Sequence, residues 1–218
     1  MSRLRLKISM SLDGFVAGPN QSVQDPLGTG GMRLHEWVFP LETFRAAHGQ
    51  GGGTVNASTA VVEESLAGIG ATIMGRNMFG GHPGGWDTAR PWNGWWGDDP
   101  PFHHPVFVLT HHPREPLVMR GGTTFTFVTG GIAAALSQAR QAANGLDVSL
   151  AGGALAAAQY LAADLVDEME ISLVPILLGA GERLFQGVGD DLHGLALART
   201  VATPDVVHLK FTRPAGEK

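Results

Sequence analysis

The sequence predicts an α/β protein in which a mostly parallel central sheet carries helices on both faces. Strand-like and helix-like segments alternate from the N-terminus to about residue 161, an order typical of parallel sheets. The composition, with 44% hydrophobic and 16% charged residues, is that of an ordered globular chain. The 218 residues are expected to form one domain, 1–218, with long loops at about 18–56 and 80–105.

Each expected element is identified by its hydrophobic period and by the residues that end it. The first strand alternates apolar and polar residues in LRLKIS and is halted by Asp13-Gly14. Ser58 or Thr59 is the expected N-cap of the first long helix. In chain order, strands are expected at 4–16, 71–75, 106–110, 125–128, 148–151, 165–175 and 208–212, and helices at 58–70, from 76, at 132–143 and at 154–161.

Two long irregular segments interrupt this pattern. Residues 18–56 are rich in glycine and proline and contain one apolar island around Trp37, and residues 80–105 contain Trp86, Trp92, Trp95 and Trp96. Long loops inside a domain are often functional or belong to an interface. Trp37 and the tryptophan cluster could stack on a planar heterocycle, but clustered tryptophans equally anchor loops or dimer contacts.

Charge and cysteine content narrow the possible partners and compartment. The formal charge of -5 arises from 15 basic and 20 acidic residues without long runs of one sign, so neither a nucleic-acid nor a membrane partner is expected. The chain has no cysteine, which excludes disulfides and thiolate metal sites and fits a reducing compartment. No apolar run of about 18 residues occurs, and we expect a soluble, cytoplasmic protein.

A shared ligand site is expected at three places where a strand ends in small or polar residues. Carboxyl ends of parallel strands meet at one edge of a sheet, where ligands bind. Glycines allow main-chain N–H groups to approach a pyrophosphate, and a guanidinium suits phosphate. A metal site is not expected, because adjacent histidines point in different directions. The three sequences are Gly75-Arg76-Asn77, Thr110-His111-His112 and Gly152-Gly153-Ala154.

Candidates for proton donation are carboxyl groups near these strands. A buried carboxyl with a raised pKa can donate a proton beside a hydride transfer. Asp13, at the end of the first strand, is the first candidate and Glu63, on the first long helix, is the second; Glu36 and Glu64 are further possibilities. The alternative roles are turn formation for Asp13 and a solvated helix face for the Glu63-Glu64 pair.

Five motifs in order resemble the dihydrofolate reductase-like family, in particular the C-terminal domain of the riboflavin biosynthesis deaminase-reductase. They are SLDGFVAG at 11–18, TIMGRNMFG at 72–80, VFVLTHHP at 106–113, AGGALAAAQYL at 151–161 and LVDEMEISLVPILLGAGERLF at 165–185. Together they span nearly the whole chain. The resemblance implies a three-layer dihydrofolate reductase-like fold with an antiparallel C-terminal hairpin, NADPH as hydride donor, and a homodimer.

The resemblance also implies roles for individual residues. The second motif would meet the cofactor phosphates or ribose, the third would lie by the adenosine half with His111 and His112 near its 2′-phosphate, and the fourth would cradle the pyrophosphate. The first motif would lie towards the nicotinamide and substrate. The cofactor-binding residues would be Gly75, Arg76, Asn77, Thr110, His111, His112, Gly152, Gly153, Ala154, Leu155 and Gln159; the substrate-binding residues Ser11, Asp13 and Trp37; and the catalytic residues Asp13 and Glu63.

The expected function is therefore hydride transfer from NADPH to a pterin, a ribosylaminopyrimidine or a similar planar heterocycle, as in 5-amino-6-(5-phosphoribosylamino)uracil reductase or dihydrofolate reductase. The chain departs from dihydrofolate reductases at the helix before the MGR strand, where Thr59 stands near the position of their acid and Glu63 follows about one turn on. The cysteine-containing zinc site of the deaminase half is absent. The alternative function is a non-catalytic dimeric nucleotide-binding or scaffold protein that keeps the fold.

Overall fold

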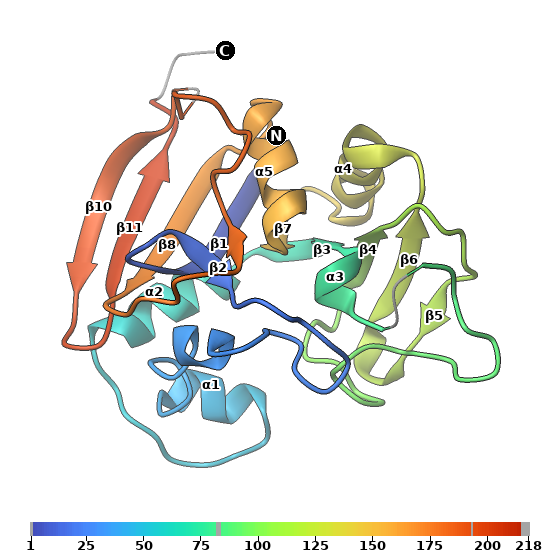
Figure 1. Cartoon of the computed structure of the whole chain (residues 1–218), viewed down its shortest axis with the longest axis horizontal. Coiled ribbons are helices and arrows are strands. Elements are labelled where there is room, and N and C mark those ends of the chain that lie inside the picture. The colour runs from blue at the N-terminus through green and yellow to red at the C-terminus, as the bar shows by residue number, and fades with distance from the viewer. Residues whose placement is uncertain (1, 82–83, 193, 215–218) are drawn as a thin grey trace.

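A nine-stranded sheet runs through the computed structural model, which describes residues 2–81, 84–192 and 194–214 (Figure 1). The strand order is β10-β11-β8-β1-β7-β3-β4-β6-β5, and a two-stranded sheet pairs β2 with β9. The strands are β1 (Leu4–Ser11), β2 (Phe15–Ala17), β3 (Ile69–Gly75), β4 (Pro105–Leu109), β5 (Leu117–Val118), β6 (Thr124–Val128), β7 (Asp147–Gly152), β8 (Glu168–Val174), β9 (Glu182–Arg183), β10 (Ala196–Ala202) and β11 (Val207–Thr212).

Strand directions confirm the predicted fold class. β1 pairs in parallel with β7 and β8, and β3 pairs in parallel with β4 and β7, as does β4 with β6. The exceptions are at the sheet margins, where β11 is antiparallel to both β8 and β10, and β5 is antiparallel to β6. The C-terminal hairpin is therefore antiparallel, as expected.

Helices cover both faces of this sheet. They are η1 (Gly31–Leu34), α1 (Glu42–Ala47), α2 (Ala57–Leu66), α3 (Arg76–Phe79), η2 (Arg120–Gly122), α4 (Gly131–Ala142) and α5 (Ala154–Ala162). Leu4 and Leu6 of β1 pack in one cluster with residues of α4 and α5, whereas Arg5 donates to main-chain carbonyls at the C-terminal end of α2. Because successive side chains of a strand point to opposite faces, α2 lies opposite α4 and α5.

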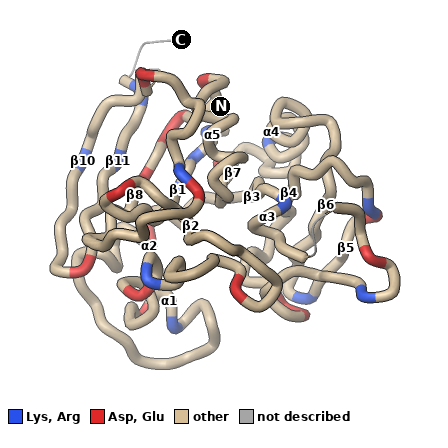
Figure 2. The backbone as a smooth tube through the Cα atoms, viewed as in Figure 1, with Lys and Arg blue, Asp and Glu red and all other residues tan. Residues whose placement is uncertain are grey.

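The two faces differ in chemistry. The α4 and α5 face is an apolar core that includes the fully buried Tyr160 and Leu150. Beneath α2 the sheet instead carries buried polar side chains, among them Glu168 and His208. Buried charges are tolerated when paired, and Glu168 accepts from Arg5 Nε at 3.2 Å. Figure 2 shows basic and acidic residues interspersed along the chain.

A separate hydrophobic cluster lies on the face of the sheet opposite α4. It consists of side chains from β3, β4 and β6 and from the loop that contains Trp86, Trp92 and Trp96, called the tryptophan loop. Phe79 of α3 is fully buried there and meets Phe125 and Phe127 edge to face. Trp86 meets the ring of Phe127 with centroids 4.8 Å apart. This packing fixes the loop at 84–102 against the sheet, beside the exits of β3 and β4.

Some expected boundaries are corrected. The segment 4–16 is divided between β1 and β2 by the turn at 12–14. The N-cap of α2 is Asn56, whose Oδ1 accepts from Ser58 N at 2.8 Å, while Thr59 Oγ1 accepts from Asn56 N at 3.0 Å. This reciprocal capping box uses Thr59 as its third residue, so the expectation of Ser58 or Thr59 as the cap is wrong by two or three positions.

Candidate functional site

The three turns expected to form one site lie side by side. β3 pairs with β4 so that Gly75 lies opposite Leu109, directly before Thr110. β3 also pairs with β7, with Met74 opposite Gly152. A Cβ atom placed on Gly75 would lie 3.4 Å from Gly153 N. We call the edge formed by residues 75–77, 110–112 and 152–155 the rim.

The start of α5 supplies the main-chain donors of the rim. Gly153 is the N-cap and has no side-chain hydrogen bond to the first turn. The first intrahelical bond to Gly153 O comes from Ala157 N, at 3.0 Å. A Cβ atom on Gly153 would meet no atom within 4 Å, so its surroundings are open. Uncapped N–H groups at a helix N-terminus favour an anion.

The neighbouring residues differ in their access to a ligand. Ala154 is 6% exposed, so that only its main chain would be available to a ligand, whereas Leu155 is 63% exposed. Gln159 is exposed one turn further along α5 and donates to Leu155 O at 3.2 Å. At the β3 exit, Asn77 is exposed and Arg76 is half-buried.

The turn after β4 uses its hydroxyl group internally. Thr110 is 8% exposed, and its Oγ1 accepts from His112 N at 3.1 Å. Its amide donates to Val128 O at 3.1 Å. The Thr110 side chain therefore shapes the turn, while His111 is exposed and His112 half-buried beside it.

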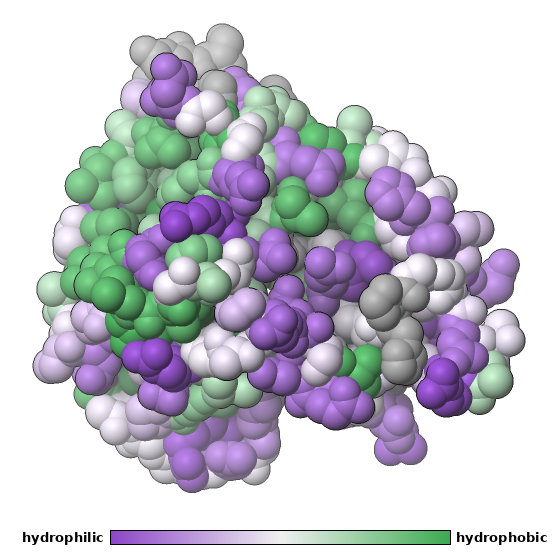
Figure 3. Space-filling model, in the orientation of Figure 1, coloured by the Kyte–Doolittle hydropathy of each residue, from purple (hydrophilic) through white to green (hydrophobic). Residues whose placement is uncertain are grey.

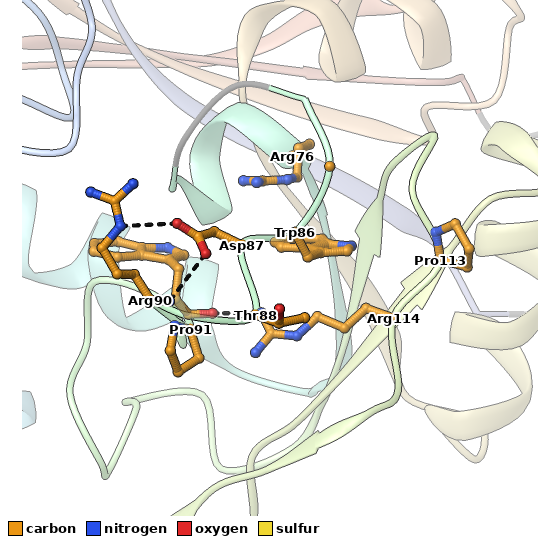
Figure 4. A pocket seen from close by; sticks show the side chains of 10 residues that line it. Arg76, Trp86, Asp87, Thr88, Arg90, Pro91, Pro113 and Arg114 are labelled. Carbon is orange, nitrogen blue, oxygen red and sulfur yellow. Dashed lines mark hydrogen bonds and ion pairs between the residues drawn. The ribbon is translucent and has the colours of Figure 1, made fainter.

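The tryptophan loop joins the rim through a stack of three side chains (Figure 4). The Arg76 guanidinium lies 3.9 Å from the centroid of the Trp86 ring, and that of Arg114 lies 4.9 Å from it. Trp86 Nε1 donates to His112 O at 2.9 Å. The contacts of the two guanidiniums with the Trp86 ring are cation–π interactions. Sequence analysis did not identify Arg114, because a single arginine after a proline carries no motif.

Asp13 forms a structural turn at the end of β1. Its carboxylate accepts from Ser11 Oγ at 2.6 Å, from Gly179 N at 2.7 Å and from Leu178 N at 3.1 Å. The Ser11 hydroxyl, together with these two amides, lowers the pKa of Asp13 to about 2. A carboxyl group with this pKa is ionised at neutral pH, so these contacts describe a turn former, and proton donation by Asp13 stays a prediction.

Ser11 and Trp37, the other residues expected to meet the substrate, are both buried. Ser11 is 0% exposed, and its Oγ accepts from Phe15 N at 3.0 Å. Trp37 is 7% exposed; it donates from Nε1 to Ser9 Oγ at 3.3 Å and meets His208 edge to face. These contacts make Ser11 a turn former and Trp37 an anchor for the segment 31–41, and contact of either residue with a substrate stays a prediction.

Glu63 does not lie in the rim. It is exposed on α2, and Thr43 Oγ1 donates to its Oε1 at 3.4 Å. Thr43 belongs to α1, which packs on α2 away from the exits of β3 and β7. Glu63 is thus an exposed carboxylate on α2 and not a sheltered one, and its role as a proton donor stays a prediction.

Fold and rim together define an α/β protein with a candidate anion-binding edge on a parallel sheet. A protein-family model, described as the RibD C-terminal domain, matches residues 2–209. The chain therefore belongs to the RibD C-terminal domain family, a family of reductase-type domains of riboflavin biosynthesis. A search of curated proteins finds no match.

Solved structures share the fold at low sequence identity. A protein of Shewanella sp. PV-4 described as a riboflavin biosynthesis protein is 20% identical, with a TM-score of 0.60 over 97% of this chain and 99% of that one. The Thermotoga maritima diaminohydroxyphosphoribosylaminopyrimidine deaminase/5-amino-6-(5-phosphoribosylamino)uracil reductase is 13% identical, with a TM-score of 0.55 over 98% of this chain. Acinetobacter baumannii RibD is 18% identical, with a TM-score of 0.55 over 97%.

This chain spans 57% of the Thermotoga chain and 58% of the Acinetobacter chain. Within the described residues, no helix has the length and apolarity needed to cross a membrane. The same residues contain no group of three or more histidine, aspartate or glutamate side chains arranged to hold a metal ion.

Proposed function

We propose that this protein is an NADPH-dependent reductase that reduces a planar heterocycle such as a ribosylaminopyrimidine or a pterin. The observation that carries the proposal is the convergence of Gly75 and Gly153 at the uncapped start of α5. Membership of the RibD C-terminal domain family supports the same reaction class. When bound, the nicotinamide supplies a hydride, and the protein supplies position and electrostatics.

Residues of the rim would hold the cofactor. The main-chain N–H groups of Ala154 and Leu155 would donate to the diphosphate, and Arg76 would add a guanidinium. Gly75 would allow α5 to lie this close to the end of β3, since a Cβ there would lie 3.2 Å from Ala156 Cβ. The exposed Leu155 side chain would shield the dinucleotide from water on the outer side.

The end of β1 would receive the substrate. Leu12 and Leu177 are 57% and 64% exposed, and Leu12 N donates to Ile176 O at 3.0 Å, so the two leucines lie on adjoining segments. Apolar surface of this kind suits a flat ring. Asp13 would fix the two segments rather than exchange a proton, and the proton that accompanies the hydride would then come from solvent.

Titration of the purified protein with NADPH, followed by nicotinamide fluorescence, tests the proposal. We expect saturable binding, and NADPH oxidation when a ribosylaminopyrimidine or dihydrofolate is added. Binding without turnover across such a panel would favour the non-catalytic alternative. Absence of binding would refute the proposal.

Gly153→Val tests the diphosphate cradle directly. The φ of Gly153 is -72°, an angle that valine adopts, and the added side chain would enter the open space in front of α5. We expect NADPH affinity to fall by about tenfold or more, because the loss of charge-assisted hydrogen bonds has that scale. Gly51→Val is the matched control, since a Cβ there also meets no atom within 4 Å. Unchanged affinity in a folded Gly153→Val variant contradicts the cradle.

A further inference from the structure

A cavity of about 400 Å³ adjoins the rim on the side of the tryptophan loop. Its walls come from Arg76 after β3, from residues 85–92 of the loop, and from Pro113-Arg114 after β4. Sites for small ligands begin at about 300 Å³, so the cavity has room for a nucleotide fragment. Figure 3 shows that the surface on this side of the molecule is mostly hydrophilic, while hydrophobic surface gathers over β8, β10 and β11.

The cavity is cationic. Arg76, Arg90 and Arg114 line it together with one acidic residue, Asp87. Asp87 is already engaged, because Arg90 Nε lies 2.9 Å from its Oδ2. Three guanidiniums and one carboxylate give the walls an excess of two positive charges, which matches the roughly -1.5 to -2 charge of a phosphate monoester at neutral pH.

Trp86 holds two of these guanidiniums in place. Arg76 and Arg114 lie on opposite sides of its ring (Figure 4), and its indole N–H is tied to His112 O. Burial, together with the like charge of Arg114, lowers the pKa of Arg76. Trp86 thus fixes the guanidinium of Arg114 beside that of Arg76 before any ligand binds, which reduces the ordering cost of binding.

Arg114 has donors left for a ligand. Its Nη1 donates to Trp92 O, and its Nη2 donates to Asn93 Oδ1 at 2.9 Å. These partners are neutral carbonyl oxygens, whereas a guanidinium has five N–H donors. Within the described part of the chain, no carboxylate forms an ion pair with Arg114. Burial lowers the pKa of Arg114, and an anion would compensate that loss of solvation.

We propose that this cavity receives the phosphorylated ribose of the adenine dinucleotide and that Arg114 determines the selection of NADPH over NADH. The inference rests on the proposed function and deepens it. It moves the 2′-phosphate from His111 and His112 towards the stack of Arg76, Trp86 and Arg114. Trp86 is a positioning residue in this arrangement.

The test uses adenosine 2′,5′-bisphosphate and adenosine 5′-diphosphate as probes in calorimetric titrations. Arg114→Met keeps the length and an apolar contact with Trp86 but removes the charge. We expect it to weaken binding of the bisphosphate by about tenfold to a hundredfold, the effect of one charge-assisted hydrogen bond. Binding of the 5′-diphosphate should change by less than about twofold, because its phosphates lie at α5.

Two controls separate this role from a general effect of charge or folding. Arg120→Met makes the same charge change at a side chain that is 78% exposed, and we expect both probes to bind as in the wild type. Trp86→Ala should selectively weaken binding of the bisphosphate, and Trp86→Phe should retain most of the affinity by keeping a ring between the guanidiniums. Thermal unfolding reports whether each variant is folded.

The outcomes distinguish the two proposals. If the wild type prefers NADPH but Arg114→Met weakens both probes equally, or neither, the selectivity role is wrong and the reductase proposal stands. If the wild type binds neither dinucleotide, both proposals fail. A selective loss in folded Arg114→Met, absent in Arg120→Met, supports the assignment.

Discussion

At the scale of single residues, the role of Asp13 is indicated by its hydrogen bonds and not by its residue type alone. A carboxylate at the end of a central strand suggests acid chemistry, but here it accepts hydrogen bonds from a hydroxyl and two main-chain amides. Those donors join the turn after β1 to the segment after β8. The carboxylate of Asp13 therefore maintains the shape of the proposed substrate surface, and its negative charge strengthens the hydrogen bonds of the turn.

Asp13→Asn should destabilise the protein in a pH-dependent way. The pKa is lowered from 3.8 to about 2 in the folded protein, so the stabilising contribution is complete above pH 3.8 and is lost as pH falls towards 2. We expect the melting temperature of the variant to lie below that of the wild type at neutral pH, and the difference to shrink below about pH 4. Thermal unfolding across this range measures it, and a difference that stays constant down to acid pH would contradict the prediction.

The sequence predicted where the main chain turns at the ends of β3 and β7, but it did not predict which side chains are buried. The glycines at the ends of β3 and β7 were identified because a strand followed by glycine has few structural alternatives, and their convergence is confirmed. Ser11 and Trp37 were taken for ligand contacts, because residue type does not reveal that both are buried. Arg114 was missed because its role depends on Trp86, distant in sequence and adjacent in space.

At the scale of elements, α2 is attached to the sheet through a polar layer. His208 of β11 lies between two hydroxyl groups, with Nδ1 3.0 Å from Ser172 Oγ and Nε2 2.9 Å from Ser58 Oγ. Serine hydroxyls can donate to one ring nitrogen and accept from the other, so a neutral imidazole is satisfied on both sides. This connection joins α2, β8 and β11 within the molecule.

His208→Gln should remove part of the pH dependence of stability. Burial, with the nearby charges of Lys7 and Arg199, lowers the pKa of His208 from 6.5 to about 4. Between these pH values the unfolded chain binds a proton that the folded chain does not. The free energy of unfolding therefore decreases as the pH is lowered from 6.5 towards 4, by at most about 1.4 kcal/mol per pH unit from this group, and is unaffected above pH 6.5.

Urea unfolding at about pH 7, 6 and 5 compares the two slopes. We expect the wild type to lose more stability than His208→Gln across this range. The same slope in both proteins would assign the pH dependence to other groups. Glutamine can still bridge the two serines, so the variant is expected to remain folded.

Element boundaries were predictable where burial imposes a clear pattern. β3, β4 and β6 are short apolar runs, and sequence analysis located them within about two residues. β10 was missed because it is an edge strand with mostly exposed side chains on both faces, which leaves no alternation to detect. The N-cap of α2 was misplaced because Asn56 and Thr59 share the capping.

At the scale of the whole molecule, the alternation of strands and helices was sufficient to predict a mostly parallel sheet, whereas the C-terminal hairpin was implied by the family resemblance. Strand order was not predictable, because β1 pairs with segments more than 140 residues away. No local pattern encodes such a pairing. The order nevertheless determines the site, since it brings the exits of β3, β4 and β7 together.

A homodimer is a prediction at this scale. β10 is the outer strand of the described sheet, and Leu197 on it is 56% exposed, so an unpaired edge and apolar surface coincide. We expect a solution mass of about 46 kDa, twice the 22.9 kDa of the chain. Light scattering after size exclusion measures it. Leu197→Lys should yield monomers, because a charge on an edge strand opposes pairing; a monomeric wild type would contradict the prediction.

The place of β1 in the middle of the sheet has a consequence for biosynthesis. Its two neighbours, β7 and β8, begin at Asp147 and Glu168, whereas β1 ends at Ser11, so more than 130 residues are synthesised between β1 and either partner. Pairings this remote in sequence form slowly and leave strand edges exposed in the meantime. β1 is thus synthesised long before the two strands that enclose it, and the rim can form only after β7 and the start of α5 have been synthesised.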